Sequence, residues 1–202
     1  TAPVLSLSSG TLSFGDRVLW HNLNLSVQPG EFLAVLGPNG TGKTSLLKSI
    51  LGQQRLSSGS ISLLGRPVGR GSRAIGYIPQ QQLLEQGTPL RARDLVALGV
   101  NGHRWGLPLV SKAVRSTVDA ALASVGASEY ANVPVATLSG GEQQRIRVAQ
   151  SIAGDPRLLL CDEPLLSLDL HHQRAISELI DTQRKATGAA VVFVTHDVNP
   201  IL

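Results

Sequence analysis

The sequence contains one cysteine, no methionine and no long apolar segment. Its single cysteine, Cys161, cannot form a disulfide within the chain, which is compatible with a reducing compartment. A membrane-spanning helix needs a run of about 18 apolar residues. The longest apolar stretches here, such as residues 189–194, have only the length of a strand. Because the first ten residues lack a basic segment followed by an apolar one, a signal peptide is not expected.

Charge is sparse and evenly spread along the chain. There are 18 basic and 14 acidic residues, which gives a net charge of +4. The sequence contains no basic tract, so nucleic acid is not an expected partner. Of its 202 residues, 42% are hydrophobic, which is enough for a sizeable core. The sequence therefore predicts a single globular domain over residues 1–202.

Segments of strand character alternate with segments of helical character. Apolar runs and alternating patterns predict strands at residues 4–7, 23–27, 31–36, 60–64, 74–78, 158–161 and 190–195. Spacing of three and four between apolar residues, with glycines at the ends, predicts helices at residues 43–52, 111–125, 142–153 and 170–185. Alternation of this kind is typical of an α/β fold with a parallel sheet. Between residues 80 and 138 the pattern is helical.

Residues 37–44 read GPNGTGKT and fit the phosphate-loop pattern G-x-x-x-x-G-K-[ST]. Glycines in such a loop let backbone N–H groups point at a polyphosphate. The lysine contacts the β- and γ-phosphates, and the hydroxyl of the threonine can bind Mg²⁺. An apolar strand precedes the loop and a helix follows it, as the pattern requires. The predicted nucleotide-binding residues are Gly37, Pro38, Asn39, Gly40, Thr41, Gly42, Lys43, Thr44 and Ser45.

A second glycine-rich stretch, LSGGEQQR at residues 138–145, opens a predicted helix. Free N–H groups and the positive end of the helix dipole suit an anion there. Since the phosphate loop already holds one set of phosphates, a second anion site is redundant within one chain. We therefore expect two chains to meet head to tail, each presenting this stretch to the other's nucleotide. The predicted contact residues are Ser139, Gly140, Gly141 and Glu142.

An apolar strand ends in the two carboxylates Asp162 and Glu163, at the sheet edge where the phosphate loop also emerges. Asp162 is the expected Mg²⁺ partner, and Glu163 is the better candidate to polarise the attacking water. The alternative is that the two carboxylates cap the helix that follows, which Pro164 makes plausible for one of them but not for both.

The order of these motifs closely resembles the ATP-binding cassette (ABC) family, whose signature reads LSGGQ; Glu142 stands at its fifth position. The resemblance covers nearly the whole chain. It implies an α/β phosphate-loop NTPase core with a mixed or parallel sheet, N-terminal antiparallel strands and a helical insertion. The core would comprise residues 1–79 and 139–202, and the helical subdomain residues 80–138. ATP and Mg²⁺ are the implied cofactors. Because members of the family usually continue for some tens of residues beyond the position of His196, a truncated C-terminal end is expected.

The same resemblance assigns roles to four further residues. Gln80 is similar to the glutamine that reaches Mg²⁺ and the attacking water, although Gln81 or Gln82 would fit if the register slipped. His196 is similar to the switch histidine that contacts the γ-phosphate. Phe14 matches the aromatic residue that stacks on adenine, but a phenylalanine in an alternating strand can equally belong to the core. Asp169 lies in the loop that crosses to the other subunit.

The resemblance implies an ATPase subunit of a transporter. Its partners would be a second, identical ATPase subunit, an integral membrane permease and an extracytoplasmic substrate-binding protein, and it would lie at the cytoplasmic face of the membrane. LLSLDLHHQ and VTHDVNPIL resemble the zinc, manganese or iron import branch. The alternative is a non-transport ABC ATPase acting on nucleic acid or ribosomes. Residues 101–106 are a candidate permease contact, although Trp105 can equally cover the core of the helical subdomain. His171 and His172 are interpreted as a solvated helix start.

Overall fold

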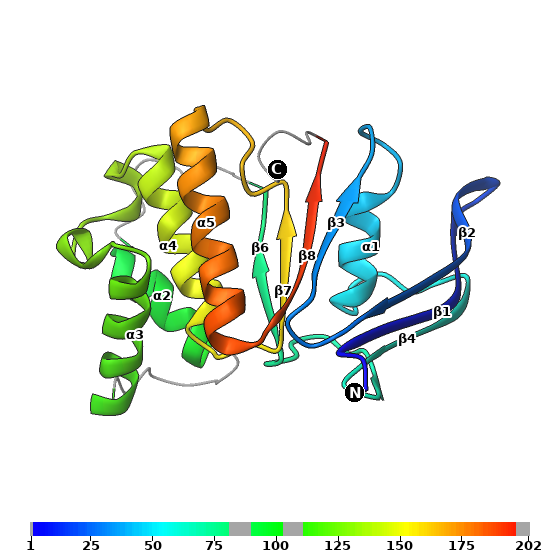
Figure 1. Ribbon diagram of the computed structural model, residues 1–202, viewed down its shortest axis with the longest axis horizontal. Coiled ribbons are helices and arrows are strands. Elements are labelled where there is room, and N and C mark those ends of the chain that lie inside the picture. Colours follow the sequence, from blue (N-terminus) through cyan, green and yellow to red (C-terminus); the bar gives the residue numbers. More distant parts are fainter. Residues whose placement is uncertain (1, 81–89, 103–110, 197–202) are drawn as a thin grey trace.

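The computed structural model describes residues 2–80, 90–102 and 111–196 (Figure 1). A parallel sheet lies at its centre, with the strand order β3-β8-β7-β6. Every residue of β7 and β8 is buried, as expected for strands covered on both faces. The predicted α/β fold with a parallel sheet is confirmed. The four strands are β3 (Phe32–Leu36), β6 (Ile75–Ile78), β7 (Leu158–Asp162) and β8 (Ala190–Thr195).

Helices cover both faces of this sheet, so its strands contribute to two cores. Successive residues of a strand face opposite sides. Leu158 and Leu160 accordingly pack in the core that includes α1, whereas Leu159 and Cys161 pack in the core that includes α4 and α5. Figure 1 shows α1 on one side of the sheet and the other two helices on the opposite side. The three helices are α1 (Lys43–Ile50), α4 (Gly140–Ile152) and α5 (Leu170–Thr187).

The N-terminal strands form a separate antiparallel sheet with the order β2-β1-β4-β5, which confirms the antiparallel strands implied by the family. A tight turn at Gly15 joins the first two strands and pairs Phe14 with Arg17. These strands are longer than the sequence predicts, because β1 pairs with a neighbour on each side and ladder hydrogen bonds extend it past its apolar positions. The strands are β1 (Leu5–Phe14), β2 (Arg17–Val27), β4 (Ser58–Leu63) and β5 (Arg66–Pro67).

The described part of the predicted helical insertion contains α2 (Ala92–Asn101), α3 (Lys112–Ser124) and two 3₁₀ turns, Ser128–Tyr130 and Val135–Thr137. The predicted apolar face of α3 is buried except for Val114, which is partly buried, and the helix is capped at its start by the side chain of Ser111. Helices α2 and α3 share one apolar core with α4, α5 and one face of the parallel sheet. The helical insertion is thus anchored on the helix that follows the LSGGE stretch.

Two helices, α4 and α5, begin at the residue that follows a side-chain cap. Helix α4 begins at Gly140 rather than at the predicted residue 142, because Ser139 caps it. After β7, turns occupy residues 164–167, and α5 begins only at Leu170 with Asp169 as its cap. The alternative that Asp162 and Glu163 cap the following helix is therefore wrong.

Candidate nucleotide site

The phosphate loop connects β3 to α1 and encloses a lysine. Lys43 is buried, and its Nζ donates hydrogen bonds to the backbone oxygens of Gly37 (2.7 Å) and Pro38 (2.9 Å). Gly42 caps α1 at a φ of 93°, and a Cβ there would lie 3.0 Å from the Trp20 ring. Only glycine tolerates both that backbone angle and that close approach. The loop therefore holds the positive charge of Lys43 against two of its own main-chain carbonyl oxygens.

Thr44 and Asp162, which are 118 residues apart in the chain, meet beside this loop. Thr44 Oγ1 donates to Asp162 Oδ1 (3.2 Å), and Tyr77 Oη donates to Asp162 Oδ2 (3.3 Å). Burial raises the pKa of Asp162, while the two hydroxyl hydrogen bonds oppose that rise. Burial and the adjacent carboxylate together raise the pKa of Tyr77 to about 12, so its hydroxyl stays protonated. Each carboxylate oxygen of Asp162 is thus held by a hydroxyl group.

Glu163 follows in a constrained conformation. Its φ of 46° lies in the left-handed region, which typically costs a non-glycine residue on the order of 1–3 kcal/mol and recurs at functional sites. Its largely buried carboxylate lies between two basic groups: Oε1 is 4.0 Å from Lys43 Nζ, and Oε2 is 3.4 Å from His196 Nδ1. The fold thereby joins the phosphate loop, the second carboxylate and the residue after β8.

A cavity of about 680 Å³ opens above the phosphate loop. Phe14 forms part of its wall and is 50% exposed, so the interpretation of this residue as core is wrong. Of the predicted site residues, the cavity is lined by Phe14, Asn39, Gly40, Gly42, Lys43, Thr44, Ser45, Gln80, Glu163 and His196. Gln81 and Gln82, the other register for the predicted glutamine, lie outside the described residues.

Four residues of this site were not predicted from the sequence. Arg17, Leu19 and Leu166 line the cavity, and Arg17 Nη2 donates to the backbone oxygen of Gly40 (3.3 Å). A two-residue turn after Phe14 would have placed Arg17 beside it. Tyr77 gave no such signal, because its contact with Asp162 depends on the pairing of β6 with β7.

The residues present fit a nucleotide with its magnesium ion. The Thr44 hydroxyl and the Asp162 carboxylate are the oxygen ligands that Mg²⁺ prefers, and they already lie within hydrogen-bond distance of each other. The Lys43 ammonium offers a positive charge to phosphates, and Phe14 offers an exposed ring at the cavity's edge. Thr44 and Asp162 would hold Mg²⁺ there, and the ion would supply positive charge that neutralises the negative charge of the phosphates.

The LSGGE stretch forms a complete capping box at the start of α4. Ser139 N and Oγ both donate to Glu142 Oε2 (2.8 and 2.7 Å), and Glu142 N donates to Ser139 Oγ (3.4 Å). These hydrogen bonds from Ser139 are the main cause of a lowered pKa for Glu142. Neither Ser139 nor Glu142 lines the cavity above the phosphate loop, so this stretch faces elsewhere.

Asp169 begins α5 close to that stretch. Its Oδ1 accepts the backbone N–H of His172 (2.9 Å), and its Oδ2 lies 2.8 Å from His172 Nδ1. The ring of His172 also packs on Gly141. The interpretation of His172 as part of a merely solvated helix start is therefore incomplete, and its spacing of three from Asp169 was the available signal.

Comparison with known proteins agrees with this geometry. A family profile described as "ABC transporter" matches residues 20–166. The iron(3+)-hydroxamate import ATP-binding protein FhuC of Bacillus subtilis is 34% identical over 200 residues, spanning 96% of this chain and 74% of that protein. A zinc import ATP-binding protein, ZnuC of Marinobacter nauticus, is 33% identical over 202 residues, spanning 100% of this chain and 72% of that protein.

Solved structures give the same result. A putative metal-chelate type ABC transporter in an inward-facing conformation matches with a TM-score of 0.87 and 28% identity, covering 100% of this chain and 76% of that one. CbiO1 from Clostridium perfringens, part of the ABC transporter complex CbiONQ, matches with a TM-score of 0.83 and 26% identity, covering 98% and 80%. Within residues 2–80, 90–102 and 111–196, no helix is both long and apolar enough to cross a bilayer. The phosphate loop, its paired carboxylates and these matches show that the chain belongs to the ABC transporter family, as one of its ATP-hydrolysing subunits.

Proposed function

We propose that this chain hydrolyses MgATP with Glu163 as general base, and that it does so to drive an importer. The observation that carries the catalytic proposal is the Glu163 carboxylate, held between Lys43 Nζ and His196 Nδ1 at the phosphate loop. Asp162, Thr44 and Gln80 are the proposed Mg²⁺ ligands, directly or through water. Phe14 is the proposed stacking partner of adenine.

The chemistry follows from these positions. Lys43, now bonded to two loop carbonyls, moves its ammonium onto the β- and γ-phosphates. Glu163 accepts a proton from water as the water oxygen attacks the γ-phosphorus, and the bond to the β–γ bridging oxygen breaks. Base catalysis of this kind is worth roughly 10²–10⁴ in rate. His196 keeps the carboxylate oriented through Oε2 and faces the γ-phosphate.

Glu163→Gln tests this assignment. The amide cannot take up the proton, whereas the size and the backbone conformation stay the same. We expect ATP affinity within about threefold of the wild type and turnover reduced by about 10²-fold or more. Calorimetry and phosphate release measure the two quantities. Turnover at the wild-type rate would remove Glu163 from this role.

The second proposed element is a head-to-tail pair of identical chains. Ser139, Gly140, Gly141 and Glu142 form the start of a helix, where the positive end of the helix dipole suits an anion, and that start lies apart from the chain's own nucleotide cavity. A second copy offers the missing phosphates. Because Glu163→Gln retains ATP, this variant is expected to accumulate as a dimer in MgATP, which sedimentation or size-exclusion chromatography detects.

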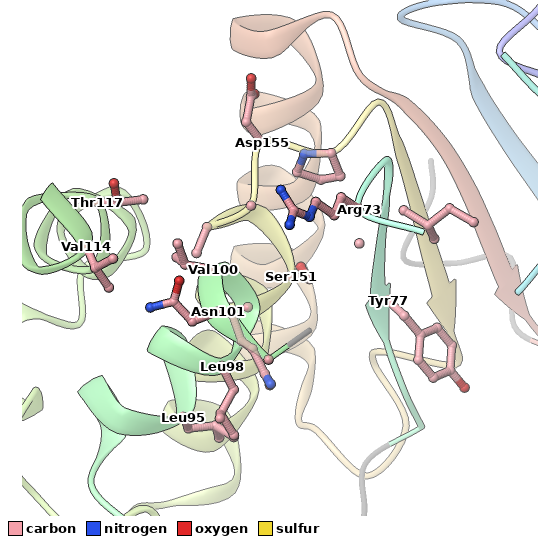
Figure 2. A pocket seen from close by; sticks show the side chains of 18 of the residues that line it. Arg73, Tyr77, Leu95, Leu98, Val100, Asn101, Val114, Thr117, Ser151 and Asp155 are labelled. Atoms are coloured by element: carbon pink, nitrogen blue, oxygen red, sulfur yellow. The ribbon is translucent and has the colours of Figure 1, made fainter. Parts of the chain in front are cut away.

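A groove of about 1060 Å³ is the proposed seat of the membrane permease. Figure 2 shows Leu95 and Leu98 on α2 and Val114 on α3 around it. Leu98 is 51% exposed, which favours an apolar occupant such as one face of a short helix. Asn101 and Gly102 of the predicted contact also line the groove. His103, Arg104, Trp105 and Gly106 lie outside the described residues.

Cysteine crosslinking tests this groove. Cys161 is fully buried, so labels will report introduced cysteines. Cysteines at Leu98 and Thr117 should crosslink to the permease in the assembled transporter, with a yield that depends on ATP. A cysteine at Glu178, exposed on α5, is the matched control. Crosslinks that arise only from residue 178 would contradict the proposed groove.

The proposed cargo is a metal ion or its chelate, taken up with the help of an extracytoplasmic binding protein. Its support is the naming of the relatives, which are described as zinc and iron(3+)-hydroxamate import proteins. This role places the subunit at the cytoplasmic face of the membrane, against the permease. The alternative of a non-transport ATPase acting on nucleic acid or ribosomes is not favoured, because the relatives are import proteins.

A further inference from the structure

The side chain of His172 does more than the start of α5 requires. Asp169 caps that helix by accepting the backbone N–H of His172 at 2.9 Å, and any residue at position 172 supplies that N–H. The imidazole adds a second contact, with Nδ1 2.8 Å from Asp169 Oδ2. Helix capping alone therefore does not account for the imidazole.

The proton on that bond can be assigned. Asp169 has a pKa below its ordinary value, chiefly because of the hydrogen bond from the His172 backbone N–H and next because of the imidazole. An ionised carboxylate only accepts hydrogen bonds. Nδ1 therefore carries the hydrogen and donates a hydrogen bond to Asp169 Oδ2.

The other edge of the ring contacts the LSGGE helix. A Cβ added to Gly141 would lie 2.4 Å from His172 Cδ2 and 2.9 Å from its Nε2. Real Cβ contacts are essentially never this close, so the ring lies directly on the glycine backbone. His172 also contributes to the lowered pKa of Glu142, after the larger effect of the hydrogen bonds from Ser139. One side chain thus touches both the Asp169 loop and the start of α4.

We propose that His172 is a positioning residue that fixes the Asp169 loop against the LSGGE helix, so that both reach the second copy's nucleotide as one rigid unit. The inference rests on the proposed head-to-tail dimer. His172 does not line the cavity above its own phosphate loop, so its loss leaves ATP binding by the single subunit unchanged. Its effect falls on the association of two ATP-bound copies.

The experiment measures dimer dissociation by sedimentation in MgATP, with Glu163→Gln as the parent. His172→Ala should weaken the dimer about tenfold, because a symmetric pair loses the contact twice. His172→Asn keeps an N–H near the position of Nδ1 and should restore the parent value within about threefold. His172→Gln keeps the bulk but carries its N–H farther out, near the position of Nε2, and should behave like alanine. His171→Ala is the control on the same helical turn.

Each outcome decides the matter. A parent that stays monomeric in MgATP refutes the proposed dimer and this inference with it. A parent that dimerises, together with a His172→Ala variant of equal dimer affinity, overturns the inference alone. So does a fall in the ATP affinity of the single subunit, measured at concentrations too low for dimers. If His172→Asn behaves like His172→Gln, the hydrogen bond to Asp169 is not the cause.

Discussion

Replacing Tyr77 with phenylalanine removes one of the two hydroxyl groups that hold Asp162. The ring still fills its place on β6, and only the contact between Oη and Asp162 Oδ2 is lost. Thr44 continues to donate to Oδ1. Since Tyr77 has a pKa of about 12, it donates a proton to this hydrogen bond throughout any ordinary assay range. The substitution therefore tests whether Tyr77 prepares the carboxylate that we assign to Mg²⁺.

The expected size follows from the geometry. Hydrogen bonds to charged groups are worth about 1.5–3 kcal/mol, but at 3.3 Å this one is long for an O–H···O contact. We expect a loss of about 1 kcal/mol, which weakens Mg²⁺ affinity about fivefold. The pH dependence has a definite sign. Burial already raises the pKa of Asp162, and losing a donor to its carboxylate raises it further. Activity that needs the ionised form is then lost at a higher pH during acidification.

ATPase rates measured against Mg²⁺ concentration, at several values of pH, provide the assay. Tyr130→Phe removes the same atom from a tyrosine packed against the other core and is the matched control. Tyr77→Phe should require more Mg²⁺ for half-maximal rate and should show an acid limb at higher pH, whereas the control should match the wild type. If the Mg²⁺ dependence and the acid limb both stay unchanged, Tyr77 does not prepare the carboxylate that we assign to Mg²⁺.

Two further predictions follow from the same contacts. Lys43→Ala should weaken MgATP binding about 10- to 100-fold, because a buried ammonium on phosphate is a charged hydrogen-bond donor. Calorimetry measures the affinity, and Lys112→Ala on α3 is the control. An unchanged ATP affinity in Lys43→Ala would contradict the proposed site. Glu142→Ala should lower the free energy of unfolding by about 1 kcal/mol and Tm by about 2–4 °C, because it breaks the capping box. Glu142→Gln should keep most of that stability. Since the pKa of Glu142 is lowered, the stabilisation is present at neutral pH and is lost as pH falls through the folded-state pKa. If Glu142→Ala lowers the free energy of unfolding equally at low and at neutral pH, the ionised carboxylate is not the source of the stabilisation.

What the sequence determined by itself was local. The phosphate loop follows from eight consecutive residues, because glycine conformations and an N–H-lined turn depend only on neighbouring positions. The apolar face of α3 follows from spacing along one helix, and β7 and β8 follow from short apolar runs. Helix α4 starts at Gly140, two residues before its predicted start at residue 142, although the capping box S-x-x-E was present in the sequence. Motif order then predicted the family, which the comparisons confirm.

Only the tertiary structure decided which distant side chains meet. Thr44 and Asp162 are 118 positions apart in the sequence, and the order of the parallel strands brings them together; no periodicity encodes their distance of 3.2 Å. The contact of Tyr77 with Asp162 depends on which face of β6 the ring occupies beside β7. Phe14 was ambiguous in sequence because an aromatic residue suits a core and a binding site equally; its exposure at the end of β1 excludes the core. The contact of His172 with Gly141 arises from the packing of α4 against α5, and packing is a property of the whole fold rather than of either helix.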